Sequence, residues 1–493
     1  MAKRKIVLLL GLALPLAACS VGPEYRPAST TELGVPDEFS VVADQRAQED
    51  LARWWGKFDD PMLAELVEMG RKGNLDVGQA MARLRQARES LVQARGALLP
   101  TVGVSGSVSH SESLRGGTTT TTLPDGTVTS YSQGGSTSYS LGGDASYTID
   151  LFGGNASNAR AARAAYEASG YTYAATMISI EAEIARNYVL ARLYQAQLAH
   201  AKASLAIQDD NLQIAGWRVQ AGLVSSLDVE QARSQRAQTA ASIPGIEANY
   251  NAAVSRLAVL TGQSPGALKA RMAETRPIPH GPESVAVGIP ADTLRQRPDV
   301  LSAERNLAAA TARIGVSKAQ LYPSLSIGGS IDTGADSIGS LGDLITGRLF
   351  ANIAQTLFDG GRRQSQVRAS EAAAEGAFLA YKQTVLTSLE DIENAIFALD
   401  AAQRREREYT IALDAATNQA LLARDQYRSG LTDFTTLNTA ESALLSARNG
   451  LAQAQADKAN ALIQLYTALG GGWNSTSAPE ATSSTTGSTA DGN

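Results

Sequence analysis

The chain has 493 residues, a formal net charge of −6, 44% hydrophobic residues and a mean hydropathy of −0.13. The acidic balance argues against a nucleic-acid partner. The low mean hydropathy excludes a protein built of membrane-spanning helices, but not a β-barrel, whose lipid face alternates with polar residues.

The N-terminus has the pattern of an export signal. Three basic residues precede an apolar run, and Leu16-Ala17-Ala18-Cys19 follows it. The run is shorter than the ~20 residues that a membrane-spanning helix needs. We therefore predict a signal peptide at 1–18 and a lipid-anchored N-terminal segment at 19–73, with the lipid on Cys19, which is the only cysteine. An ordinary cleaved signal beside an inert cysteine is the alternative.

The rest of the chain contains one unit twice. Four landmarks recur in the same order, roughly 205 to 225 residues apart. They pair Ala97–Val102 with Gln320–Leu325, Asp150–Gly154 with Leu357–Gly361, Gln220–Leu223 with Arg428–Leu431, and Leu260–Gly262 with Leu469–Gly471. We predict helix, two strands, long helix, turn and helix in each of two repeats, 74–275 and 299–472. A proline-rich linker at 276–298 joins them, and the Ser/Thr-rich tail at 473–493 is expected to be disordered.

The predicted strands are long and two-faced. Apolar or small residues alternate with polar ones from Tyr139 to Leu151, and a noisier strand is expected from Leu344 to Phe358. Such strands exceed the ~9–11 residues that cross a membrane. His110 to Ser138 suits an extracellular loop. Four strands cannot close a barrel alone, so several chains must contribute; one face of a soluble β-sandwich is the alternative.

The predicted helices are unusually long. Between Gly361 and Gly430 there is no proline and only one glycine, which predicts a helix of roughly 65 residues, about 100 Å in length. Its apolar residues recur at alternating steps of three and four, which is a heptad seam. Heptads alone would also fit a soluble bundle or a coiled-coil rod. Strand pairs of membrane-crossing length in both repeats favour a membrane channel instead.

At this point the sequence resembles the outer-membrane factor family of TolC-like channels, in particular its NodT/OprM-like lipoprotein branch of tripartite efflux systems. Three stretches carry the resemblance: Cys19–Tyr25, Trp54–Pro61 with Asn74–Asp76, and Arg297–Val300 running on to Pro323. The resemblance implies an α+β tandem-repeat protomer of a trimeric channel. Four strands per chain would join one outer-membrane β-barrel, continuous with a long periplasmic α-helical barrel.

The helical turns are the candidate gate. We expect Gly222 and Gly430 to reverse the chain, because glycine tolerates a positive φ. Tyr427 matches a family tyrosine that helps to close the periplasmic tip, although it could equally be packing in the seam. The possible polar partners of Tyr427 are Asp228, Arg428 and Asp433. Three copies of either aspartate would form a cation-attracting ring; helix capping is the plainer interpretation.

The chemistry points to a channel and not to an enzyme. The three histidines are His110, in a predicted loop, His200, on a helix, and His280, in the linker, and they form no catalytic or metal-binding constellation. We predict no cofactor and no metal. The resemblance implies a homotrimer, a periplasmic adaptor, an inner-membrane pump of the RND type and contact with outer-membrane lipid. The function expected is a passive exit duct; a structural coiled-coil lipoprotein without channel activity is the alternative.

Overall fold

The fold is taken from a computed structural model, which describes residues 21–41, 51–112, 114, 118–132 and 135–474. The signal peptide, Cys19 and all but the first two residues of the predicted tail therefore lie outside the described residues. The chain divides into two units, each described by itself. Unit 1 comprises Met1–Arg26, Ala87–Ala165 and Leu307–Ala377; unit 2 comprises Pro27–Gln86, Tyr166–Asn306 and Phe378–Asn493.

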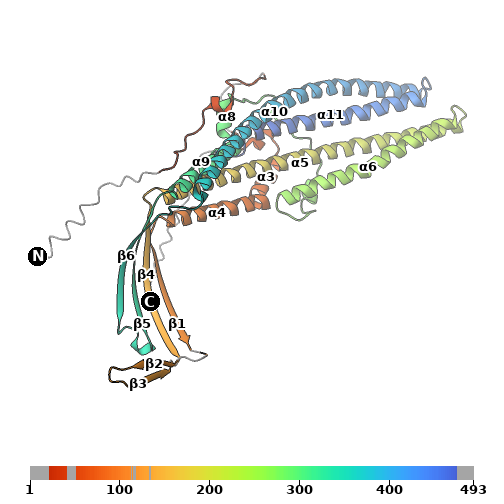
Figure 1. Cartoon of the computed structure of the whole chain (residues 1–493). Coiled ribbons are helices and arrows are strands. Elements are labelled where there is room, and N and C mark those ends of the chain that lie inside the picture. Colours follow the sequence, from red (N-terminus) through yellow and green to blue (C-terminus); the bar gives the residue numbers. More distant parts are fainter. Residues whose placement is uncertain (1–20, 42–50, 113, 115–117, 133–134, 475–493) are drawn as a thin grey trace, which may run out of the picture. The chain divides into compact units, whose positions relative to one another are not determined.

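The tandem repeat predicted from the sequence is confirmed in the lengths of its elements. Each repeat contains helices of 22, 67 and 35 residues and two long strands. The first repeat has α4 (Leu75–Gly96), β1 (Thr101–Ser111), β4 (Ser136–Ile149), α5 (Gly154–Gln220) and α6 (Ser226–Leu260). The second has α9 (Pro298–Ala319), β5 (Ser324–Ala335), β6 (Ile345–Ala354), α10 (Arg362–Arg428) and α11 (Phe434–Ala468) (Figure 1).

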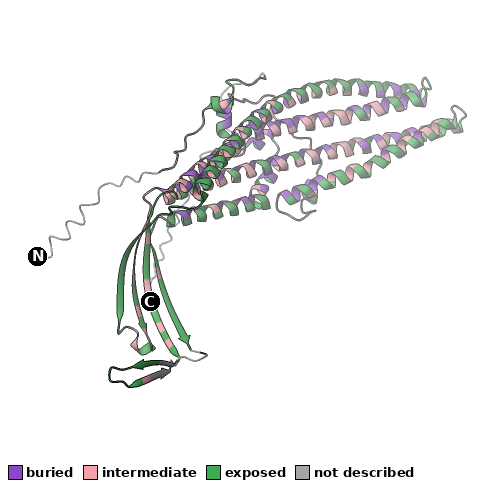
Figure 2. Cartoon of the chain, viewed as in Figure 1, coloured by how far each residue is buried: buried purple, intermediate pink, exposed green. Residues whose placement is uncertain are grey.

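Unit 1 holds an antiparallel sheet of four strands in the order β1-β4-β5-β6 (Figure 1). The central pairing joins the repeats, with Tyr147 of β4 opposite Ile327 of β5. Most side chains of these strands are exposed, including large apolar ones on β1 and β6 (Figure 2). Such exposure is expected of strands that face lipid on one side.

Two expectations about the strands are wrong. The segment from His110 to Ser138 is not all loop, because β2 (Thr118–Thr122) pairs with β3 (Val128–Ser132) within it and His110 belongs to β1. The fourth strand is also shorter than Leu344–Phe358, since β6 ends at Ala354. Threonine favours strands, so a Thr-rich stretch on either side of a Pro-Asp-Gly turn forms a hairpin.

Unit 2 anchors the N-terminal segment on the helices through aromatic packing. The segment contains α2 (Thr30–Leu33), the 3-10 helix η1 (Trp54–Phe58) and α3 (Pro61–Gly73). Trp54 is fully buried, and its ring stacks on Tyr466 of α11 with centroids 5.6 Å apart. Asp60 caps α3 by accepting from the backbone N–H of Met62 at 2.9 Å, and it also accepts from the Tyr188 hydroxyl of α5 at 2.6 Å. The Trp-Trp motif is therefore part of the core of unit 2.

The linker between the repeats is held to the helices by a buried arginine. It contains α8 (Pro290–Gln296), follows the short α7 (Lys269–Met272) and ends at α9. The Arg297 guanidinium donates to the Ala468 carbonyl at 2.9 Å and pairs with Asp299 at 2.7 Å. In unit 1, the 3-10 helix η2 (Ile338–Ser340) lies between β5 and β6. Within the described ranges, no helix is both long and apolar enough to cross a membrane.

Candidate functional site

The two helical hairpins of unit 2 turn by the same backbone device. Gly222 and Gly430 have φ values of 71° and 74°. The N–H that follows each glycine donates back across the turn, from Leu223 to the Arg218 carbonyl at 2.9 Å and from Leu431 to the Gln426 carbonyl at 2.8 Å. This is a Schellman motif, whose left-handed position favours glycine. Both predicted glycines thus lie where a side chain would be strained.

The helices that leave the turns are capped at equivalent positions. Ser225 accepts from the N–H of Leu227 at 3.2 Å at the start of α6, and Asp433 accepts from the N–H of Thr436 at 2.8 Å at the start of α11. The hydrogen bond from Thr436 lowers the pKa of Asp433 below its usual value. Asp228 lies in the first turn of α6. Asp433 is therefore a helix cap in this chain, as the plainer interpretation has it.

Tyr427 lies at the point where the two hairpins meet. Its side chain is 1% exposed and packs edge-on against Phe434, with ring centroids 5.9 Å apart. The Arg218 guanidinium, from α5, sits 4.6 Å from the centre of the Tyr427 ring and donates to the Tyr427 carbonyl at 3.0 Å. Burial raises the pKa of the Tyr427 hydroxyl, Arg218 lowers it and Asp228 raises it. Arg218 therefore joins the first hairpin to the second.

Arg218 is the residue that the sequence analysis missed. At the corresponding place the second repeat has Gln426, and where the second repeat has Tyr427 the first has Val219. The first repeat therefore supplies only the arginine of this link and the second only the tyrosine, although the two turns are alike. Of the predicted polar partners of Tyr427, Arg428 ends α10 with an exposed side chain. The feature of the sequence that could have indicated Arg218 is its position as a cation in the last turn of a helix.

A buried polar network joins the hairpins one to two helical turns further along. Glu441 of α11 accepts from the Asn211 side chain of α5 at 2.8 Å and pairs with Arg424 of α10 at 3.3 Å. An apolar cluster built largely of alanine and leucine lies on the same stretches of α10 and α11. Burying charge inside such a cluster is costly unless every partner is present. The network fixes the rotation of three helices about one carboxylate.

The outer surface of the turns is apolar. Leu223 and Leu227 of the first hairpin are 69% and 60% exposed, and Leu431 of the second is 79% exposed. Trp217 is also exposed, near the end of α5. Apolar side chains that gather at an exposed end are typical of an interaction surface. Within the part of the chain that the structure describes, no cluster of three or more His, Cys, Asp or Glu could hold a metal ion.

Comparisons with known proteins agree on one family. Residues 66–263 and 289–471 match the family described as outer membrane efflux protein. Nodulation protein T of Rhizobium leguminosarum bv. trifolii is 32% identical over 468 residues, covering 94% of this chain and 96% of that protein. The pyoverdine export outer membrane protein OpmQ of Pseudomonas aeruginosa is 29% identical, covering 95% and 97%. The solved outer-membrane channel OprN is 31% identical, with a TM-score of 0.81 over 92% of this chain and 100% of that one.

These similarities bear directly on the interpretation of the sequence. The predicted fold class, an α+β tandem-repeat protomer of the trimeric outer-membrane channels, is confirmed. The predicted function in efflux and the outer-membrane location are confirmed as well. The family and the relatives are channel proteins and not enzymes. This chain belongs to the outer membrane efflux protein family.

Proposed function

We propose that three copies of this chain form a passive exit duct, which catalyses no reaction and is opened from its periplasmic end. The sheet supports an assembly, because β1 and β6 are its two edges among the described strands. Open edges in lipid leave unpaired backbone groups that cost several kcal/mol each. Pairing β6 of one copy with β1 of the next removes both edges. Three sheets of four strands then give one barrel of twelve.

The partners we propose are a periplasmic adaptor and an inner-membrane pump of the RND type. The two similar turns of each chain give a trimer six related ends, each bearing exposed leucines. A ring of adaptor subunits could bury these side chains. Relatives are named for pyoverdine export and for cation efflux. Because the duct is a wide and weakly selective exit, we propose that the pump selects the cargo.

The observation that carries the gating proposal is the contact of Arg218 with Tyr427. A resting duct must be closed, since an open one would leak periplasmic contents. Closing contacts must also be exchangeable for contacts with the adaptor. A cation over an aromatic ring at the end of the helices meets both conditions, because it joins the two hairpins through contacts that are not covalent. We propose this link as the latch, with Gly222 and Gly430 forming its turns.

Purified protein in a planar bilayer tests the proposal. We expect discrete conductance steps and, in detergent, a particle with the mass of three chains. A structural coiled-coil lipoprotein, the alternative, has no reason to conduct ions. A trimer that never conducts, or a folded monomer that does, would contradict the proposal.

Cys19 supplies the proposed lipid anchor. We expect Cys19→Ala to abolish labelling by fatty acid but to leave part of the trimer in the outer membrane. Each buried CH₂ of an acyl chain adds about 0.8 kcal/mol, whereas a closed barrel anchors the protein independently. Metabolic labelling with palmitate, followed by membrane fractionation, measures both. Equal labelling of the variant and the wild type would show that Cys19 is not the lipidated residue.

A further inference from the structure

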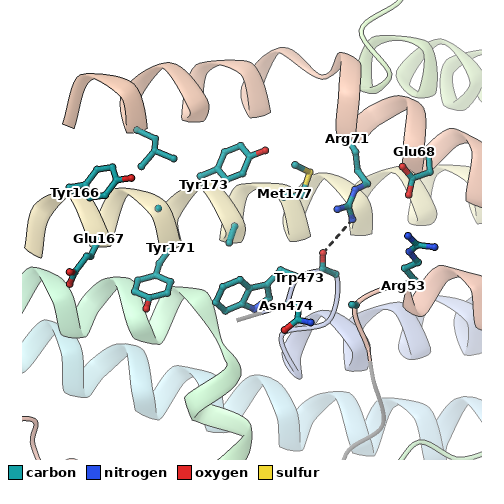
Figure 3. Close-up of a pocket in the computed structure, with 15 residues that line it drawn as sticks. Arg53, Glu68, Arg71, Tyr166, Glu167, Tyr171, Tyr173, Met177, Trp473 and Asn474 are labelled. Carbon is teal, nitrogen blue, oxygen red and sulfur yellow. Dashed lines mark hydrogen bonds between the residues drawn. The ribbon is translucent and has the colours of Figure 1, made fainter. Parts of the chain in front are cut away.

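Unit 2 contains a cavity of about 580 Å³ away from the hairpin ends. This volume lies within the range of roughly 300–1,000 Å³ that is usual for small-molecule sites. Its walls come from the residues just before η1, from α3, α4 and α5, and from the residues that follow α11 (Figure 3). The lining side chains used below are aromatic (Tyr171, Tyr173, Trp473) or charged (Arg53, Glu68, Arg71). The gate and the barrel do not use any of them.

The aromatic part of the cavity is held in a fixed orientation. The Trp473 indole N–H donates to the Gln296 carbonyl at 2.9 Å. The Trp473 ring meets Tyr171 edge-on, with centroids 5.9 Å apart and planes at 84°. Tyr171 and Tyr173 both come from α5 (Figure 3). Ring faces that are already oriented bind flat apolar surfaces without a further loss of conformational entropy.

The charged side chains of the cavity differ in whether they have partners in the protein. Arg71 is held by the fully buried Glu181, at 2.6 Å, and by the Trp55 ring, 5.3 Å from its guanidinium carbon. Burial raises the pKa of Glu181 to about 8, although Arg71 opposes this effect. Among the described residues, Arg53 and Glu68 form no ion pair and no side-chain hydrogen bond. Within the described parts of the chain, one exposed cation and one exposed carboxylate therefore line the cavity without a protein partner.

We propose that this cavity binds a saccharide. A simple anion would be repelled by Glu68 and a simple cation by Arg53 and Arg71. A hydroxyl group is both donor and acceptor, so neighbouring sugar hydroxyls can accept from Arg53 and donate to Glu68 at once. The apolar C–H face of a sugar ring can lie flat on one of these two perpendicular rings, Trp473 or Tyr171, while the other borders its edge. A sugar could come from the cell-wall glycan or from a soluble oligosaccharide.

Calorimetry on the full-length trimer in detergent tests the proposal, with chitotetraose as the soluble probe and purified cell-wall sacculi in a co-sedimentation arm. We expect chitotetraose to bind. Glu68→Gln and Arg53→Ala should each weaken binding about tenfold, as expected for the loss of one charged hydrogen bond. Trp473→Leu should weaken it further. The matched control is Arg407→Ala, an exposed arginine of α10 outside the cavity, which should bind as the wild type does.

The variants also separate binding from folding and from transport. Glu68 is exposed, so Glu68→Gln should leave both the melting temperature and the conductance unchanged. Binding of sacculi as well as chitotetraose would identify the cell wall as the source; binding of chitotetraose alone would identify a soluble sugar. The proposal is overturned if the wild type binds neither probe, if the cavity variants bind as tightly as Arg407→Ala, or if free glycine, a neutral zwitterion, displaces chitotetraose.

Discussion

Arg218→Leu should raise the open probability of the channel and lower its melting temperature much less than Tyr427→Ala does. The substitution removes a cation–π contact and a charged hydrogen bond to Tyr427, together worth about 2 kcal/mol per protomer. If both exist only in the closed state, the ratio of closed to open falls about 30-fold for each protomer. A leucine at position 218 still covers part of the Tyr427 ring, so the buried side chains around that ring keep most of their packing. Single-channel recording and thermal unfolding of the same preparation measure the two quantities.

Two comparisons make the result decisive. Arg233→Leu removes an equally long cation from an exposed pair with Glu230 on α6, so it should not change gating. Tyr427→Ala should open the channel and also lower the melting temperature, because truncating a buried aromatic residue costs roughly 3–5 kcal/mol. If Arg218→Leu conducts as the wild type does and Tyr427→Ala only lowers the melting temperature, then Tyr427 is seam packing and not a latch.

Glu441→Leu should destabilise the trimer strongly. It leaves the largely buried Arg424 without its counter-charge and Asn211 without its acceptor. Removing one partner of a buried pair typically costs about 3–5 kcal/mol. The thermal unfolding midpoint of the purified trimer should fall accordingly.

The double variant Arg424→Leu/Glu441→Leu should recover most of the lost stability, since an apolar pair in an apolar surrounding leaves no unpaired charge. Asp400→Asn is the control for an exposed pair: the Asp400 and Arg404 side chains are 58% and 64% exposed, so the loss should be at most about 1 kcal/mol. A double variant as unstable as Glu441→Leu would mean that the cost comes from packing and not from unpaired charge.

Elements bounded by local chemistry were predictable from the sequence. The long helix expected between Gly361 and Gly430 is Arg362–Arg428, because both flanking glycines adopt a positive φ, which lies outside the conformation of a right-handed helix. Because the chain contains one unit twice, the elements predicted for the first repeat also predicted those of the second. The β2–β3 hairpin was missed because a Gly- and Thr-rich stretch was assigned to a loop by composition. Its Pro124-Asp125-Gly126 turn, with Gly126 at a φ of 86°, was the signal that could have revealed it.

Contacts between distant helices were not predictable in the same way. Arg218 meets Tyr427 across 209 residues of sequence, and Asn211 meets Glu441 across 230. Which side chains meet depends on the relative rotation of long helices, and a heptad pattern fixes that rotation only to within a face. The sequence could therefore name Tyr427 and the turn glycines, which are marked by local pattern. It could not name the arginine that lies on Tyr427.

The equal lengths of the paired helices restrict how this chain can change. In both repeats a 67-residue helix leads to the turn. The contact between Arg218 and Tyr427 therefore depends on α5 and α10 having the same number of residues. Deleting one residue from α10 alone would shift everything beyond it by about 1.5 Å and turn it by about 100°. Tyr427 would then point away from Arg218. A residue added between β2 and β3 carries no such penalty. Length variation is therefore tolerable in the strand loops, whereas in the long helices it requires a compensating change in the other repeat.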